Sequence, residues 1–239
     1  MRGVLFALAL AFAFVASTPC EAAATLISRK FVGVVIDAST NQPIPGARVA
    51  AKWSSAHDRG SECVKALSVL SGHDGRFEMP EWVGASIGWG LWAQVTPYKA
   101  GYRNSRTVLV HGEARKFLGL FNRNEFELRS EPLRVEMGPF EGSDAGRAAY
   151  LAELALSTQC REGSEPFGMN VFYDGIFDEM LQLPPSAQGQ QSKGWPGGTV
   201  RDVVESLLAR TEGAHGRAKP RPYPATPAPP TAIEAKTPK

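Results

Sequence analysis

The 239-residue sequence has few cysteines, little charge imbalance and no apolar run long enough to span a bilayer. None of the three cysteines has a second cysteine or a histidine at ligand spacing, so the sequence predicts no metal site, and it contains no cofactor motif. The formal net charge of +2 is concentrated in residues 213–239, which carry +4. Residues 25–212 therefore lack the basic surface of a nucleic-acid-binding protein.

The longest N-terminal apolar run extends from Val4 to Ala16 behind Arg2. It has the length of a signal-peptide core and is well short of the roughly 20 residues that cross a bilayer. Small residues at Ala22 and Ala24 predict cleavage after one of them, with Ala24 preferred. We therefore expect residues 1–24 to be a signal peptide, no transmembrane segment after cleavage, and a periplasmic or secreted mature protein.

Cleavage removes Cys20 and leaves Cys63 and Cys160. A lipid-attached form would instead use Cys20, although Pro19 replaces the small residue that this pattern requires. A cysteine pair in an oxidising compartment is more often a disulfide than two free thiols. The sequence predicts a Cys63–Cys160 disulfide between a long loop after Trp53 and the end of the first C-terminal helix; two unrelated buried thiols are the alternative.

Residues 213–239 contain seven prolines and a single large aliphatic residue, Ile233. Such a segment buries too little apolar surface to offset the entropy of ordering it. We expect a disordered tail that acts as a solvated spacer.

The first half of the remaining chain has the pattern of short strands. Apolar and polar residues alternate in segments such as Phe31–Ile36, Ala47–Trp53 and Leu133–Met137, with turn residues between them. The first two segments are expected to form a hairpin-like start. No helical period intervenes before residue 140, which favours a β-sandwich over a parallel sheet.

Three motifs in this half carry a family resemblance. Pro43-Ile44-Pro45-Gly46-Ala47-Arg48-Val49 follows the first strand, Asp74-Gly75-Arg76-Phe77 precedes a later one, and Gly101-Tyr102 follows another. In this order they resemble the carboxypeptidase regulatory-like domain. The resemblance implies an antiparallel, seven- to eight-stranded, transthyretin-like sandwich over residues 25–137, used as a noncatalytic recognition module. The stretches between Trp53 and Ser71 and between Gly112 and Phe126 depart from the family pattern and are expected to be enlarged loops.

After Gly138 the apolar period becomes helical, which predicts a small helical region over residues 138–212. Its first helix is expected to be capped by Ser143 or Asp144 and to place Ala149, Ala152, Leu156 and Cys160 on one face. A second helix should end before Pro184-Pro185, and a third should begin with a capping box of Thr199 and Asp202. Residues 184–198 have the composition of a mobile loop.

No arrangement in the sequence calls for catalysis, and we expect the protein not to be an enzyme. Gly84-Ala85-Ser86-Ile87-Gly88 matches the nucleophile-elbow pattern of serine hydrolases, but that motif works only at a strand-to-helix turn. Here it precedes a strand in an all-β stretch. The histidines are not paired at ligand spacing and are expected on surface loops.

The aromatic residues Trp89, Trp92, Tyr98 and Tyr102 are the candidate binding residues. If Leu91, Ala93 and Val95 face the core, Trp92 points the other way, where it would stack on a sugar or anchor a partner. The alternative is that the rings lie beneath the C-terminal helices. Two functions follow: an exported noncatalytic module of the bacterial cell envelope that binds a protein or another envelope component, or a carbohydrate-binding module for envelope polysaccharide.

Overall fold

The computed structural model describes residues 24–57, 60–86, 90–105, 108–111, 113–117, 121–126, 132–160, 168–195 and 197–213. The predicted signal peptide up to residue 23, the predicted tail from residue 214 and the candidate residue Trp89 lie outside these ranges. The described chain is mainly β, with a helical region after the last strand. This confirms the predicted fold class.

Eight strands form two four-stranded sheets that pack face to face. One sheet has the order β5-β2-β12-β8 and the other the order β4-β3-β7-β9. The strands are β2 (Phe31–Asp37), β3 (Arg48–His57), β4 (Gly60–Leu70), β5 (Arg76–Met79), β7 (Gly90–Tyr98), β8 (Tyr102–Asn104), β9 (Val108–His111) and β12 (Leu133–Pro139). All pairs in these two sheets are antiparallel except β2 with β12, which is parallel.

A third sheet extends one end of the sandwich, in the order β10-β11-β1-β6. Its strands are β1 (Ala24–Ser28), β6 (Trp82–Ser86), β10 (Glu113–Phe117) and β11 (Phe121–Phe126). β1 pairs in parallel with β11 and antiparallel with β6. The first described residue, Ala24, pairs with Ser86.

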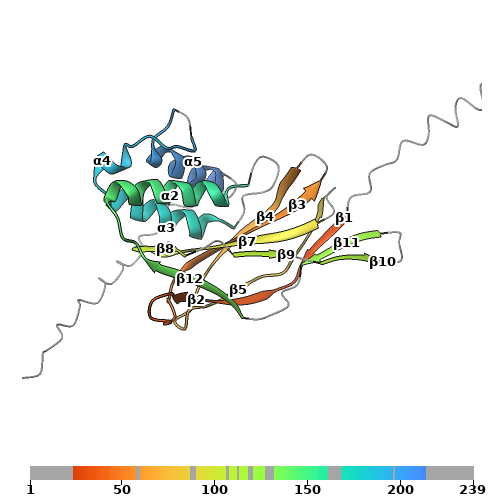
Figure 1. Ribbon diagram of the computed structural model, residues 1–239. Helices are drawn as coiled ribbons and strands as arrows, with labels where there is room; N and C mark the ends of the chain where they lie inside the picture. The colour runs from red at the N-terminus through yellow and green to blue at the C-terminus, as the bar shows by residue number, and fades with distance from the viewer. Residues whose placement is uncertain are drawn as a thin grey trace, which may run out of the picture.

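Four helices form a layer at the other end of the sandwich, as Figure 1 shows. They are α2 (Asp144–Thr158), α3 (Asn170–Gln182), α4 (Pro185–Gln188) and α5 (Val200–Gly213), and we call them the helical layer. The Ser143 hydroxyl caps α2 by accepting from the Gly146 amide. Thr199 and Asp202 exchange amide and side-chain hydrogen bonds at the start of α5, which confirms the predicted capping box.

The interior divides into two apolar clusters. One lies between the sheets and is built on large rings, among which Trp53 contacts Phe31, Trp82 and Phe126. The other cluster lies between the helical layer and the outer face of the β4-β3-β7-β9 sheet. The strands contribute Ala50, Ala66 and Tyr98 to this cluster. The small side chains of the two alanines let the helices approach the sheet closely.

Gly75 is the clearest case of a glycine required by a turn. It lies between β4 and β5 with a φ of +72°, and an added Cβ would come within 2.6 Å of the Val35 carbonyl oxygen. The sequence predicted a turn at Asp74-Gly75. The positive φ and the close approach to the Val35 carbonyl explain why this turn needs glycine.

Three predictions about local structure are wrong. β2 and β3 do not form a hairpin, because they lie in different sheets and the buried Ile44 and Ala47 of their connection pack in the core between them. The stretch after Trp53 is not a loop: β3 continues to His57, paired with β7 as far as Ala56, and returns as β4. Likewise, β10 and β11 form a hairpin in the stretch before Phe126.

Two predictions about the helices also need correction. Of the face predicted for α2, Ala149 is exposed, whereas Ala152 is buried and Leu156 and Cys160 pack against the helical cluster. The buried face of α2 is broader than predicted. That face consists of Arg147, Ala148, Leu151, Ala152, Leu154, Ala155 and Thr158. Part of the predicted loop 184–198 is helical: α4 follows Pro184, and the Gln188 side chain donates to the Leu183 carbonyl at 2.7 Å.

Candidate functional site

The outer face of the β4-β3-β7-β9 sheet carries the candidate site. Along β7, Leu91, Ala93 and Val95 are buried against the other sheet, as predicted, and the alternate residues point outward. Among the described residues, the helical layer packs on this outer face where β3 begins and β7 ends, where α3 lies in Figure 1. It also reaches Lys52 of β3 and Cys63 of β4 through the end of α2. We call the part of the face beneath these helices the covered half, and the part toward β9 and the start of β7, which no described helix covers, the uncovered half.

A buried ion pair holds the covered half. Arg147 of α2 and Glu179 of α3 form two hydrogen bonds of 2.7 Å each, and their side chains are 5% and 12% exposed. Arg147 also donates to the carbonyl of Tyr102, at the start of β8. Its guanidinium lies over the rings of Phe140 and Tyr150, at 4.9 and 5.2 Å from their centroids.

Tyr98 joins this ion pair to the sheet. Its hydroxyl lies 2.6 Å from the Gly175 carbonyl oxygen and 2.8 Å from Glu179 Oε2. Burial, and then the Glu179 charge, raises the pKa of Tyr98 well above the ordinary value for tyrosine. The ring is thus fixed as a neutral hydrogen-bonding group beneath α3.

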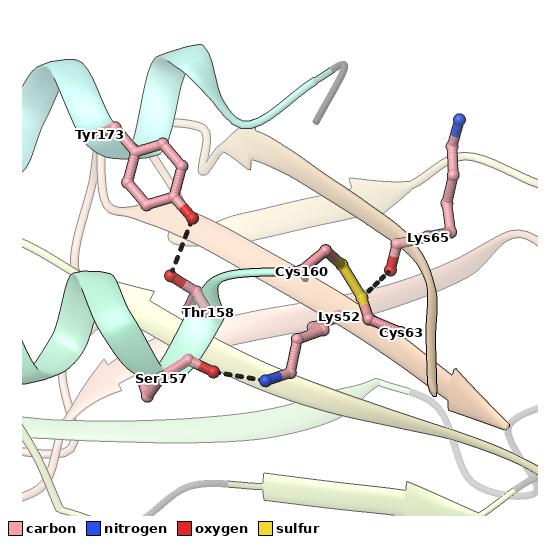
Figure 2. Close-up of a disulfide and its surroundings, with 7 residues drawn as sticks. All are labelled: Lys52, Cys63, Lys65, Ser157, Thr158, Cys160 and Tyr173. Carbon is pink, nitrogen blue, oxygen red and sulfur yellow. Dashed lines mark hydrogen bonds between the residues drawn. A yellow bond between two sulfur atoms is a disulfide. The ribbon is translucent and has the colours of Figure 1, made fainter. Parts of the chain in front are cut away.

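A disulfide makes the covalent link between the sheet and the helical layer. Cys63 of β4 and Cys160, two residues beyond α2, are joined with their Cα atoms 5.3 Å apart, which confirms the predicted pair. Figure 2 shows that Lys52 of β3 lies beside the bond and reaches the end of α2, where it donates to the Ser157 carbonyl. Burial lowers the pKa of Lys52. The disulfide and Lys52 therefore fix the C-terminal end of α2, and Arg147 fixes its N-terminal end.

The uncovered half presents side chains of β7 and β9. Trp92 is directly opposite His111, and Gln94 is opposite Leu109 in the β7–β9 register. Trp92 and Gln94 are half-buried, His111 is exposed, and Leu109 is 56% exposed. We call these four residues the uncovered surface.

The structure does not bring the predicted aromatic residues together. Trp92 lies on the uncovered surface, whereas Tyr98 is 1% exposed and lies beneath α3. Tyr102 is half-buried and packs against the core between the sheets, where burial and the Asp37 carboxylate raise its pKa. Sequence reasoning missed Leu109 and His111. The signal was present, because Val108 and Val110 face inward and their alternate residues must then point outward.

The serine of the elbow motif does not lie at a strand-to-helix turn. Ser86 ends β6, is buried, and donates to a carboxylate oxygen of Glu62, and the next described segment is strand β7. Within the described ranges, no three histidine, cysteine or acidic side chains gather as a metal site would require. The described helices also include none that is long and apolar enough to cross a membrane.

The fold and site define a β-sandwich whose outer face is partly covered by a disulfide-linked helical layer. No family model matches the chain, and no curated protein matches it. The sandwich expected from the carboxypeptidase regulatory-like resemblance is present, and membership of that family stays a prediction.

Several solved structures match parts of the chain. A streptococcal ancillary pilin matches with 18% identity over 42% of this chain and 30% of the pilin, with a TM-score of 0.24. The pilus 2b backbone protein of group B streptococcus matches with 16% identity over 48% and 41% of the two chains, with a TM-score of 0.24. The plantain pollen allergen Pla l 1 matches with 10% identity over 51% of this chain and its whole length, with a TM-score of 0.23. The matches span less than half of each pilin, and similarity at this level carries no argument about function.

Proposed function

We propose that the protein is an exported, noncatalytic β-sandwich module that binds a protein partner through the uncovered surface. The observation that carries the proposal is the incomplete cover of one sheet face. Alanines and Tyr98 lie beneath the helices, whereas Trp92 and Leu109 remain accessible to a partner. A large ring beside an exposed aliphatic side chain is the usual anchor of a protein interface.

The composition of the uncovered surface favours a protein partner over a polysaccharide. A sugar platform needs several aromatic faces in one plane, and of the predicted group only Trp92 is on this surface within the described residues. His111 and Gln94 add polar groups around an apolar centre, which is the arrangement of a protein-binding patch.

Export is supported by two independent features. The N-terminal apolar run has the length of a signal-peptide core, and the structure contains a disulfide, which persists in oxidising compartments.

Site-specific photo-cross-linking tests the proposal. A photoreactive phenylalanine analogue is placed at Leu109 and, as the matched control, at Leu181 of α3, which is 46% exposed. Exposed to the envelope and extracellular fractions of the source cells, the Leu109 probe should give a discrete protein adduct that the Leu181 probe does not, and Trp92→Ala should remove it. Equal adducts from both positions, or Trp92-dependent retention on a polysaccharide matrix without a protein adduct, would contradict the proposal.

A further inference from the structure

β9 is an edge strand of the β4-β3-β7-β9 sheet, and in the described part of the chain it pairs with β7 alone. In an antiparallel sheet, the N–H and C=O groups of successive residues point alternately toward one neighbouring strand and toward the other. A hydrogen bond at the opposite edge of the sheet fixes which backbone groups of β9 point outward.

That hydrogen bond is made by Ser68 of β4. Its backbone N–H donates to a carbonyl oxygen outside the sheet at 2.7 Å, so Ser68 turns its backbone groups away from β3. Ala50, directly opposite Ser68, therefore bonds to β7 through Thr96. The alternation then directs the next residue of β7, Val95, to Val108 of β9.

Leu109 and His111 consequently point their backbone N–H and C=O groups away from β7, toward the free edge. Among the described residues, no backbone hydrogen bond from outside the β7 pair reaches either residue. The side chains of the same two residues lie on the uncovered surface, where His111 is directly opposite Trp92. Such a row of unpaired backbone groups is a template for another strand.

Most other edges of the described sheets have a protection that β9 lacks. β4 is contacted at Ser68 by the segment before α3, and the sequences of β5, β8 and β10 contain lysine, arginine or glutamate. Cover and charge of this kind prevent pairing with other chains. β6 is also uncharged, but its exposed Val83 lies opposite the aliphatic Ile27. β9 combines an uncharged free edge with Leu109 and the adjacent Trp92.

We propose that the protein partner binds by adding an extended, uncharged segment of its chain to the free edge of β9. This inference rests on the proposed function and specifies how the partner is recognised. The added strand lies about 4.8 Å from β9 and bonds to the backbone of Leu109 and His111. Its outward side chains contact these two residues, and a large one opposite His111 extends toward Trp92.

Amide hydrogen exchange followed by NMR tests the strand addition on the mature protein. Without a partner, the Val110 amide should exchange slowly, and those of Leu109 and His111 rapidly. The probe is a synthetic peptide with the sequence of the partner segment recovered on the Leu109 photoreactive probe. When it binds, exchange at Leu109 and His111 should slow about tenfold or more. Of two peptides N-methylated at alternate residues, only the one modified on the edge that faces β9 should lose binding.

Backbone ester variants assign the binding to the edge. Replacing Leu109 by its α-hydroxy analogue keeps the side chain and removes only the N–H, and it should weaken peptide binding about tenfold with little change in stability. The matched analogue at Val110 removes a donor to β7, so it should lower stability and leave the affinity of the folded protein unchanged.

Three results would overturn the strand addition. Equal affinity of the wild type and the Leu109 ester, or unchanged exchange at Leu109 and His111 in the complex, would overturn it and leave the proposed partner surface intact. A recovered segment from this protein's own sequence would mean that a second copy occupies the edge. Absence of any protein adduct at Leu109 would contradict the proposed function itself, and the strand addition with it.

Discussion

The two halves of one sheet face differ in what lies on them. In the covered half, the outward residues of β3, β4 and β7 include Ala50, Ala66 and Tyr98, and all three are buried against helices. In the uncovered half, the outward residues of β7 and β9 include Trp92 and Leu109, which keep contact with solvent. The covered half is therefore closed by small residues and a buried polar network, whereas in the uncovered half no described helix covers the large side chains.

Removing one partner of the Arg147–Glu179 ion pair should cause the largest loss of stability. Arg147→Met leaves the Glu179 carboxylate buried without its partner, and we expect a loss of about 3 to 5 kcal/mol in the free energy of unfolding. Urea denaturation followed by circular dichroism measures this loss.

Two matched variants sharpen that result. Arg201→Met removes an exposed arginine paired with Glu205 within α5 and should change stability by about 0.5 kcal/mol or less. The double variant Arg147→Met/Glu179→Leu removes both charges and should recover part of the loss. A double variant less stable than Arg147→Met would show that the ion pair is not what makes the single change costly.

Loss of the disulfide should cause the second-largest loss of stability. Reduction, or Cys63→Ser with Cys160→Ser, opens a bond between residues 97 positions apart and should cost about 2 to 4 kcal/mol. Amide exchange should then accelerate at the C-terminal end of α2 and remain slow near Arg147, which is held independently. Uniform acceleration along α2 would mean that the two attachments are not separate.

Tyr173 gives the covered half a sensitivity to alkaline pH. Burial raises the pKa of Tyr173 to about 12, so the folded protein favours the neutral phenol. Because the folded pKa is above the ordinary value, this contribution is complete below pH of about 10 and is lost as pH rises through about 12. Tyr173→Phe should flatten the fall in stability over that window, as measured by urea unfolding at each pH. Tyr102→Phe replaces a half-buried tyrosine and should reduce the fall in stability over the same pH window by a smaller amount.

The uncovered half should show the smallest effect on stability. Leu109→Ser should change the free energy of unfolding by about 0.5 kcal/mol or less, and Trp92→Ala by about 1 kcal/mol. Tyr98→Ala on the covered half of the same strand should cost about 3 to 5 kcal/mol. Thermal unfolding of the three variants gives the comparison, and a Leu109→Ser variant as unstable as Tyr98→Ala would show that the two halves do not differ.

The sequence predicted features that depend on local chemistry. Alternation placed Leu91, Ala93 and Val95 in the core, and Thr199 and Asp202 gave the start of α5. Cys63 and Cys160 gave the disulfide, although Ala149, one residue of the α2 face used to argue for it, is exposed. Pairing between distant segments was not predictable. A strand pattern does not say which sheet a strand joins, so β2 and β3 were placed together wrongly.

The candidate site shows the same limit. The pattern along β7 identified Trp92 as an outward residue, but the outward Tyr98 six positions later has the same parity. Only the position of α3 over one end of the strand separates an accessible ring from a buried one. That position depends on Arg147 and Glu179, which lie 32 residues apart and gave no signal in the sequence.

Hydroxyl-radical footprinting read by mass spectrometry tests the difference between the two halves most directly. In the purified protein, the account predicts rapid oxidation of Trp92 and Leu109 and slow oxidation of Tyr98 and Tyr173, which are buried. After addition of the cross-linked partner, Trp92 and Leu109 should become protected while Leu181 stays reactive. Protection of Trp92 equal to that of Tyr98 in the purified protein, or no change at Trp92 and Leu109 on partner binding, would contradict the account.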